Sequence, residues 1–470
     1  MSDRNGRSWD LAVIGAGSAG FSAAITAAEQ GAQVALIGHG MIGGTCVNVG
    51  CVPSKALIRA AESLHHARAA ARFAGLRAEA EVSDWSALIA QKDELIAGLR
   101  QAKYADLLRA YNTIAYVQGR ARLAADGVAV NGELIPAPRT VITTGARPAV
   151  PPIPGIDEVD YLTGTSALDL KELPKSLLVV GGGFIGVELA QVFARAGVTV
   201  TIVDLVPILS MGEPEISAAL AGYFRDEGIV VRERVKTKAI RRTHDGVALD
   251  IVADGEDQTV EAEQVLIATG RTPNTEGLGL AEAGVAQVGN GSIQVDAHMR
   301  TSRSGTYAAG DVTGRDMFVY MAAHGAKVAA KNALNNDSST YDNSAIPAVV
   351  FTDPQVASVG LTEKAAKQQG INVRTSVLSL EQVPRALAAR DTRGLIKLVA
   401  DALNDRLIGA HILAPEGGDS IQTAALAIKT GMSVQELGET IFPYLTTVEG
   451  LKLAAQTFDK DVSKLSCCAG

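Results

Sequence analysis

Cysteine is scarce in this chain, and the few residues present fall into pairs. Four cysteines occur in 470 residues, as Cys46 with Cys51 and as Cys467 with Cys468. None remains for a structural disulfide or a four-thiolate zinc site. Because thiolates are the nucleophiles of redox chemistry and the ligands of soft metals, the pairs predict one of these two uses of sulfur.

The two pairs differ in their spacing. Cys46 and Cys51 are far enough apart to close a small disulfide, whereas adjacent cysteines form one only with strain. Cys467 and Cys468 are therefore better suited to binding a ligand. Thiols without structural disulfides are typical of a reducing compartment, so we expect a cytoplasmic protein.

Other absences exclude whole classes of protein. The polar start, MSDRNGRSWD, lacks the apolar segment of a secretory signal, and no apolar run approaches the roughly 18 residues of a membrane span. A net charge of −8 argues against a nucleic-acid partner, which would favour a basic face. With 47% hydrophobic residues, the chain is expected to be globular, with no membrane and no nucleic acid as partner.

An internal repeat is the main structural signal. Residues 10–38 and 176–204 each read as an apolar strand, a Gly-x-Gly-x-x-Gly turn, an alanine-rich helix, a glycine and a second strand. In such a βαβ unit, the N-terminus of the helix points at a pyrophosphate, and the glycines let the backbone approach it closely. Two copies predict two dinucleotides, most simply a flavin and a nicotinamide. The glycines are Gly15, Gly17 and Gly20 in the first unit and Gly181, Gly183 and Gly186 in the second.

The remaining segments complete the predicted architecture. Residues 140–148 and 265–274 read as strands that close the first and second units, and Asp311 follows a short strand where it could bond a cofactor hydroxyl. Residues 332–347 are polar and read as a linker. Beyond them, strands and helices without a dinucleotide motif predict an α+β domain that pairs subunits. We therefore expect an α/β chain with two Rossmann-like dinucleotide-binding domains and a C-terminal α+β dimerisation domain.

Several motifs together resemble the pyridine nucleotide–disulfide oxidoreductases over essentially the whole chain. They are GGTCVNVGCVPSK (43–55), TTGARP (143–148), GGGFIGVE (181–188), ATGRTPN (268–274), AAGD (308–311) and FTDPQVASVG (351–360). The resemblance implies FAD on the first unit, NADPH or NADH on the second, and an obligate homodimer. The domains would be 1–155 and 275–344 for FAD, 156–274 for NAD(P)H, and 345–470 for dimerisation with the Cys-Cys tail.

The resemblance also implies roles for individual residues. Cys51 would lie against the flavin as the charge-transfer thiolate, and Cys46 would be the outer, interchange thiol. Lys55 would sit near the flavin N5, paired with Glu188, and stabilise negative charge on the reduced ring; otherwise it is a solvated helix lysine. Phe184 would gate the nicotinamide pocket, or merely pack in the core. Further cofactor-binding residues would be Gly44, Thr45, Thr144, Gly145, Asp204, Gly270, Arg271 and Asp311.

One departure separates this chain from the disulfide reductases of the family. These carry a catalytic histidine near the C-terminus, which protonates the leaving thiolate. Aligned on Glu449, the chain reads YLTTVE, so Tyr444 stands where the histidine should be, and no histidine follows His411. A phenol with a pKa near 10 is a poor proton shuttle at neutral pH.

Together with Tyr444, PRALAARDTRG (384–394) and the terminal Cys467-Cys468 resemble the branch of the family that reduces Hg(II). Hg(II) is soft and favours two thiolates. The resemblance implies that Cys467 and Cys468 of one subunit take Hg(II) from thiol complexes and pass it to Cys46 and Cys51 of the other. Tyr444, from the partner, and Tyr104 match tyrosines along the metal's route, although Tyr104 could be plain helix packing. The resemblance covers the catalytic core, and we expect no N-terminal metal-binding module.

Two positions depart from the pattern of the cofactor sites. In each unit, the acid that ends the second strand binds a ribose hydroxyl. The equivalent residues here are Gly38 and Asp204. Gly38 leaves the FAD ribose to backbone or water. Asp204 suits NADH, whereas the Hg(II)-reducing branch mostly uses NADPH, and DLVPILS offers no basic residue for a phosphate.

Two other functions stay open from the sequence. The first is dihydrolipoamide dehydrogenase or another disulfide reductase, which the absence of the histidine at Tyr444 disfavours. The second is a non-catalytic protein that sequesters soft metals, which the double βαβ layout disfavours because sequestration needs no dinucleotide.

Overall fold

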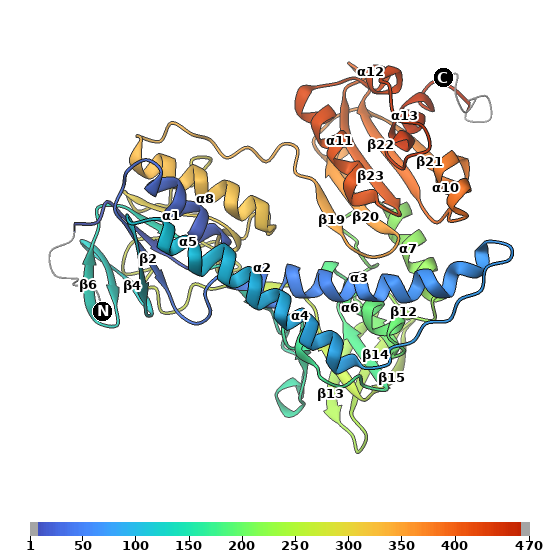
Figure 1. Cartoon of the computed structure of the whole chain (residues 1–470), viewed down its shortest axis with the longest axis horizontal. Helices are drawn as coiled ribbons and strands as arrows, with labels where there is room; N and C mark the ends of the chain where they lie inside the picture. Colours follow the sequence, from blue (N-terminus) through green and yellow to red (C-terminus); the bar gives the residue numbers. More distant parts are fainter. Residues whose placement is uncertain (1–7, 462–470) are drawn as a thin grey trace. The chain divides into compact units, whose positions relative to one another are not determined.

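The computed structural model describes residues 8–461 (Figure 1). By its internal contacts the chain divides into two compact units, which are described separately. The first unit contains residues up to Ala56, Ser86–Ala149 and Gly270–Tyr341; the second contains Leu57–Trp85, Val150–Thr269 and the residues from Asp342 onward.

A parallel five-stranded sheet forms the centre of the first unit, in the order β18-β7-β1-β2-β3. Its strands are β1 (Leu11–Ile14), β2 (Val34–Gly38), β3 (Ile114–Gln118), β7 (Thr140–Ile142) and β18 (Thr306–Ala308). Helices α1 (Ser18–Ala28) and α8 (Val319–Leu334) pack against each other beside this sheet (Figure 1). Chain connections diverge from β1 to either side, which is where doubly wound sheets bind ligands.

Smaller elements surround this sheet. The short helix α2 (Gly44–Val49) and the start of α3 (Cys51–Arg68) carry the first cysteine pair, and α4 (Trp85–Arg100) runs into a π-helical turn (Gln101–Ala105) and α5 (Asp106–Ala110). An antiparallel sheet contains β4 (Ala121–Ala124), β5 (Gly127–Val130) and β6 (Glu133–Pro136), and β8 (Ala146–Pro148) pairs with β17 (Arg271–Pro273).

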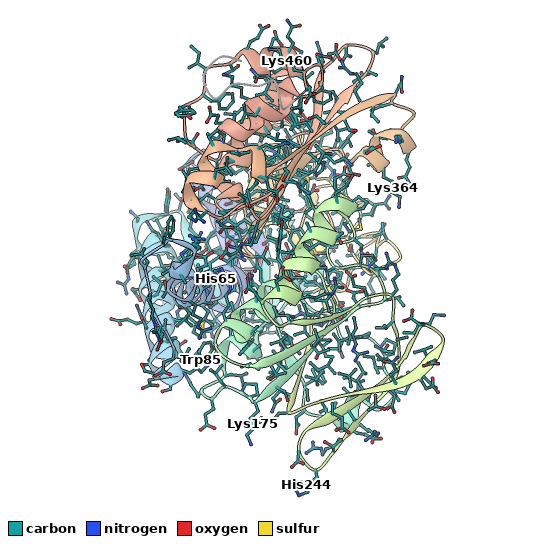
Figure 2. All side chains as sticks on the ribbon, turned by 90° about the vertical axis from the view of Figure 1, so that its right-hand side faces the viewer. His65, Trp85, Lys175, His244, Lys364 and Lys460 are labelled. Carbon is teal, nitrogen blue, oxygen red and sulfur yellow. The ribbon has the colours of Figure 1, made fainter. Side chains whose placement is uncertain are left out.

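The second unit contains another parallel sheet, in the order β12-β11-β10-β16-β9. Its strands are β9 (Leu162–Thr163), β10 (Ser176–Val180), β11 (Thr199–Val203), β12 (Val230–Arg232) and β16 (Gln264–Ile267), with α6 (Phe184–Arg195) and α7 (Pro214–Asp226). A three-stranded antiparallel sheet adds β13 (Lys236–Arg242), β14 (Val247–Ala253) and β15 (Glu256–Ala262). Figure 2 shows His244 at the exposed β13–β14 turn.

The C-terminal part of the second unit is an antiparallel sheet, β19-β20-β23-β22-β21. Its strands are β19 (Ala348–Val350), β20 (Gln355–Gly360), β21 (Val373–Ser379), β22 (Leu395–Asp401) and β23 (Leu407–Ala414); its helices are α9 (Glu363–Gln368), α10 (Pro384–Ala389), α11 (Gly417–Thr430), α12 (Val434–Glu439) and α13 (Glu449–Gln456). Apolar side chains of the strands and of α11–α13 form one buried core, which includes Ile396, Leu398, Ile412, Ile421 and Leu451.

The expected α/β architecture is confirmed. Both repeats form the predicted βαβ units, and residues 140–148 and 265–274 supply the strands that pair with β1 and β10. The predicted linker is partly wrong, because its first residues complete α8, which ends at Leu334. The boundaries of the three predicted domains stay a prediction. In the described part of the chain, no helix has both the length and the apolar character needed to cross a lipid bilayer.

Candidate active site

The turn after β1 meets the cysteine-bearing segment through backbone alone. Gly17 caps α1 and forms a bridge with Gly43, and a Cβ atom on Gly44 would lie 2.6 Å from the Gly17 Cα. Side chains are therefore excluded where the N-terminus of α1 approaches the second segment. Backbone N–H groups at such a helix start favour phosphate, so the glycines of this turn fit the pyrophosphate of a dinucleotide such as FAD.

Asn48 fixes the loop that precedes the first cysteine. Its side-chain amide donates to the carbonyls of Ile42 and Gly44 at 2.9 and 2.8 Å. Arg100 from α4 donates to the Asn48 Oδ1 at 3.0 Å. These bonds hold the loop and α2 in one arrangement, so Asn48 and Arg100 fix the segment that carries Cys46.

Cys46 and Cys51 lie together at the junction of α2 and α3, as thiols rather than as a disulfide. A hydrogen bond with Cys51, followed by burial and by the charge on Cys51, raises the pKa of Cys46. The backbone of Cys51 and the charge of Lys55 act in the opposite direction. Cys46 therefore holds a proton that it shares with Cys51, and the ammonium of Lys55 favours negative charge on the pair.

Tyr104 lies beside this thiol pair. Its ring meets Phe21 edge-on, with centroids 4.9 Å apart, and its hydroxyl lies 3.4 Å from the Ser18 hydroxyl. Burial first, and then negative charge on Cys46 and Cys51, raises the pKa of Tyr104. The residue occupies the π-helical turn after α4, a distortion that often occurs at functional sites. Tyr104 is thus a neutral hydroxyl within the electrostatic range of both sulfur atoms.

Hydrogen bonds link two further segments of the first unit that are predicted to bind cofactor, one at Thr144 and one at Asn274. The Thr144 hydroxyl donates to the Asn274 carbonyl at 2.6 Å, and the Asn274 amide donates back to the Thr144 carbonyl at 3.0 Å. Nearby, Arg271 Nε lies 3.5 Å from Asp311 Oδ2. Burial raises the pKa of Asp311, while Arg271 opposes the rise.

The second repeat has an open turn. Gly183 caps α6, and a Cβ atom built there would meet nothing within 4 Å. Asp204 follows β11, and its carboxylate accepts from the backbone N–H of Gly182 at 2.5 Å and of Val206 at 3.0 Å. The carboxylate therefore lies against the glycine turn, where a ribose hydroxyl is bound in such units. These features fit a nicotinamide dinucleotide.

This arrangement is that of a known family. The model for pyridine nucleotide-disulphide oxidoreductases matches residues 9–330, and the model for the dimerisation domain of the same family matches residues 346–455. The chain belongs to this family.

Several members of this oxidoreductase family are similar to this protein along nearly the whole chain. A mercuric reductase of Streptomyces lividans is 48% identical over 98% of this chain and 98% of its own length. That of Shigella flexneri is 48% identical over 100% of this chain and 84% of its length. Among solved structures, the Cu(II) complex of the HOCl-induced flavoprotein disulfide reductase RclA from Escherichia coli has a TM-score of 0.84 at 30% identity, covering 96% of this chain and 99% of that chain.

The predicted site residues fall into three groups in this oxidoreductase. The first unit holds Gly15, Gly17, Gly20, Gly44, Thr45, Cys46, Cys51, Lys55, Tyr104, Thr144, Gly145, Gly270, Arg271 and Asp311. The second unit holds Gly181, Gly183, Phe184, Gly186, Glu188, Asp204 and Tyr444. Cys467 and Cys468 lie outside the described residues.

The roles of three residues in the second unit, Glu188, Phe184 and Tyr444, stay predictions. Glu188 is buried and accepts from the Phe351 backbone N–H at 2.9 Å, so its pairing with Lys55 is still an expectation. Phe184 is 39% exposed at the start of α6, as a gate would need to be. Tyr444 is 49% exposed in the segment between α12 and α13.

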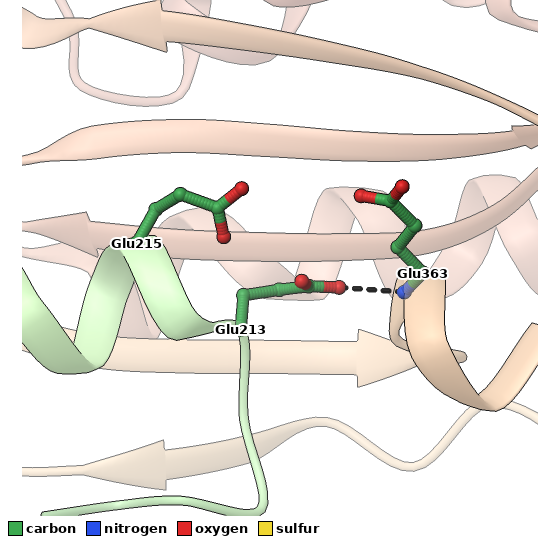
Figure 3. A group of neighbouring side chains, drawn as sticks. All are labelled: Glu213, Glu215 and Glu363. Atoms are coloured by element: carbon green, nitrogen blue, oxygen red, sulfur yellow. Dashed lines mark hydrogen bonds between the residues drawn. The ribbon is translucent and has the colours of Figure 1, made fainter. Parts of the chain in front are cut away.

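A cluster of glutamates in the second unit could be mistaken for a metal site. Glu213, Glu215 and Glu363 place carboxylate oxygens close together (Figure 3). The buried ammonium of Lys397 pairs with each of them, at 2.9, 2.8 and 2.8 Å. Burial lowers the pKa of Lys397, but its hydrogen bonds to the three carboxylates outweigh this and raise it. The cation of this cluster is thus a side chain, and the cluster ties two sequence-distant segments together.

Sequence reasoning missed the residues that support the thiol pair. Ser18, within the glycine turn, contacts the Tyr104 hydroxyl, and Asn48, between the cysteines, holds the loop. Asn48 carried a detectable signal, since it is a polar residue between two valines in the segment that joins the cysteines. Ser18 carried none, because its partner is distant in the sequence.

Proposed function

We propose that this protein reduces Hg(II) to Hg(0) with electrons from NAD(P)H, through FAD and the thiols of Cys46 and Cys51. The observation that carries the proposal is the thiol pair in a chain that lacks the acid–base histidine. Its 44–48% identical relatives, named mercuric reductase, support it further. The reaction balances as NAD(P)H plus Hg(II) giving NAD(P)+, a proton and Hg(0). It therefore needs two electrons and no proton on a leaving sulfur.

The side chains of the first unit perform the steps at the metal. Cys46 and Cys51 bind Hg(II) as thiolates, which are the ligands a soft cation prefers. Each of these thiols must lose its proton to bind the metal, and the charge of Lys55 favours this by opposing the rise in the pKa of Cys46. Tyr104 closes one side of the pair with a neutral hydroxyl. FAD, when bound, would supply the transfer of two electrons from the nicotinamide to the thiol pair; the glycine turn at Gly17 would hold its pyrophosphate.

We further propose that NADH is an effective reductant. Asp204 lies against the glycine turn of the second unit, and its carboxylate can accept a hydrogen bond from a ribose hydroxyl but repels a 2′-phosphate. Two like charges at about 4 Å repel by roughly 4 kcal/mol at an effective dielectric of 20, and solvent reduces this. NADH should thus be used about as well as NADPH.

Two copies of the chain are proposed to form the working enzyme, in the cytoplasm, where thiols stay reduced. Residues 346–455 match a dimerisation domain. Tyr444 and the Cys467-Cys468 tail of one subunit would then serve Cys46 and Cys51 of the other. The tail would collect Hg(II) from thiol complexes and deliver it by ligand exchange.

A disulfide reductase is the second candidate, because the thiol pair is intact and the similar RclA structure is titled a flavoprotein disulfide reductase. One experiment separates the two functions. Purified holoenzyme is given Hg(II) as a small thiol complex, with NADH or NADPH, and volatile mercury is trapped while nicotinamide oxidation is followed. We expect mercury release matched to oxidation, which Cys46→Ser with Cys51→Ser abolishes. Fast reduction of lipoamide or glutathione disulfide without metal would instead establish the second candidate.

A further inference from the structure

Gly38 stands where the acid that binds the FAD ribose is expected, and the side chain of Tyr116 lies beside it. Gly38 ends β2 and is buried. A Cβ atom built on it would lie 2.7 Å from the Ala16 Cβ, 3.0 Å from the Tyr116 hydroxyl oxygen and 3.2 Å from the Tyr116 Cε2. The contact with Ala16 is shorter than side chains tolerate, and the two contacts with Tyr116 would require the ring to shift by a few tenths of an ångström. Ala16 therefore opposes a side chain at Gly38, and the Tyr116 ring lies where the side chain of an acid would begin.

Strand register explains how Tyr116 reaches this point. β2 and β3 are parallel, with Leu36 opposite Tyr116 and Gly38 opposite Gln118. Alternate residues of a strand share a face, so Tyr116 lies on the face of Leu36 and Gly38. Its long side chain extends from the level of Leu36 to the level of Gly38, at the carboxyl end of the sheet. That end also carries the first glycine turn, because Ala16 contacts the same point.

The Tyr116 hydroxyl is available to a ligand. Tyr116 is half-buried, and within residues 8–461 its hydroxyl has no hydrogen-bond partner. Burial raises the pKa of Tyr116, so the phenol stays neutral at physiological pH. A neutral hydroxyl can both donate and accept, whereas a carboxylate only accepts.

We propose that Tyr116 replaces the missing acid and hydrogen-bonds the adenosine ribose of the FAD held by the first unit. The proposal rests on the proposed function only in requiring FAD at that turn. The rival explanation is that the ring merely fills space over Gly38. The two explanations differ at a single atom, since Tyr116→Phe keeps the ring and removes the hydroxyl.

The test measures FAD binding to apoprotein, by the change of flavin fluorescence on reconstitution, without any metal. A lost hydrogen bond to a ligand is worth about 0.5–1.5 kcal/mol, so Tyr116→Phe should weaken FAD binding by about 3–10-fold. The matched control is Tyr111→Phe, which removes an exposed hydroxyl from the same unit, where it lies 3.5 Å from Glu29. The control should bind FAD as the parent does.

A second ligand separates the hydroxyl from the ring. An FAD analogue without the 2′- and 3′-hydroxyls of the adenosine ribose should bind the parent and Tyr116→Phe equally. Equal binding of normal FAD by both proteins would overturn the proposal. So would an equal loss with FAD and with the analogue, because the hydroxyl would then affect FAD binding by a route other than a hydrogen bond to the ribose. The test can be interpreted even if the enzyme does not reduce Hg(II), because FAD binding is measured without the metal.

Discussion

The thiol of Cys46 is hydrogen-bonded to Cys51, and this bond is the largest of the influences that raise the pKa of Cys46. The pair therefore releases its last proton reluctantly. A Hg(II) ion that binds both sulfurs must displace that proton, so binding of the metal to the pair should release a proton.

The reactivity of Cys46 with iodoacetamide should depend on Cys51. In a Cys467→Ala, Cys468→Ala background, Cys51→Ser removes the bond and the charge that raise the pKa of Cys46. Because only the thiolate reacts, alkylation of Cys46 should then begin at lower pH, and should be faster near pH 8 than in the parent. Peptide mass mapping over a pH series measures this. An unchanged pH profile would show that the bond does not control the pKa.

Tyr104→Phe should slow mercury reduction without unfolding the protein. The ring contact with Phe21 is kept, and the hydroxyl beside Ser18 and the two sulfurs is lost. One neutral hydrogen bond corresponds to a roughly 3–10-fold lower kcat/KM for Hg(II). Melting temperature and FAD content serve as controls, together with Tyr111→Phe. Parental kinetics in Tyr104→Phe would assign the residue to packing alone.

Asp204→Arg should change the nicotinamide preference. The parent should use NADH about as well as NADPH, and the substitution should favour NADPH by about tenfold or more, since roughly 1.4 kcal/mol corresponds to a factor of ten. The measurement is kcat/KM for both cofactors. Asp245→Arg, in the exposed β13–β14 turn, makes the same charge change and should leave the ratio alone. If the parent strongly prefers NADPH and Asp204→Arg changes nothing, Asp204 does not face the ribose.

Replacing both terminal cysteines by alanine should separate metal delivery from electron transfer. The flavin spectrum should stay parental, because the proposed electron route runs through Cys51. Turnover of Hg(II) presented as a bulky dithiol complex should fall by about tenfold or more, whereas small complexes, which reach Cys46 and Cys51 directly, should be little affected. An altered flavin spectrum in the variant would place the tail in the redox centre instead.

Lys397→Met should destabilise the protein strongly. The ammonium is 2% exposed and neutralises Glu213, which is equally buried, together with Glu215 and Glu363. Removing one partner of a buried pair costs about 3–5 kcal/mol. Lys367→Met removes an exposed partner of the same Glu363 and should cost less than about 1 kcal/mol. Denaturant unfolding compares the two variants, and equal losses would contradict the importance of burial.

The same cluster predicts a pH dependence of stability. Hydrogen bonds from Lys367 and then Lys397 lower the pKa of Glu363 from 4.5 to about 2. A carboxyl with a lowered folded-state pKa stabilises the protein above its unfolded-state pKa, and this is lost as pH falls through about 2. Between these values the unfolding free energy of the parent should decrease with falling pH more steeply than that of Lys397→Met. Parallel curves would argue against the assignment.

Local patterns and long-range pairings were predicted with different success. The turns at Gly15 and Gly181 were predictable, because each combines a strand, a glycine triplet and a helix within one short segment. The neighbours of Gly38 were not, since Tyr116 is brought there by the pairing of β2 with β3. The contact of Ser18 with Tyr104 was not predictable for the same reason, because Tyr104 lies in a helical turn that is distant in the sequence.

The single ammonium of Lys397 also limits how this gene product can be divided. Its carboxylate partners come from residues 213 and 215 on one side of the chain and 363 on the other. A fragment that ends before the C-terminal sheet would contain the buried Glu213 without its cation. A separately expressed C-terminal fragment would contain Lys397, which is buried in the whole chain, without Glu213 and Glu215. When the enzyme is split between these segments, the fragments should consequently fold only when both are present together. The ion pairs of Lys397 would then form between the two fragments.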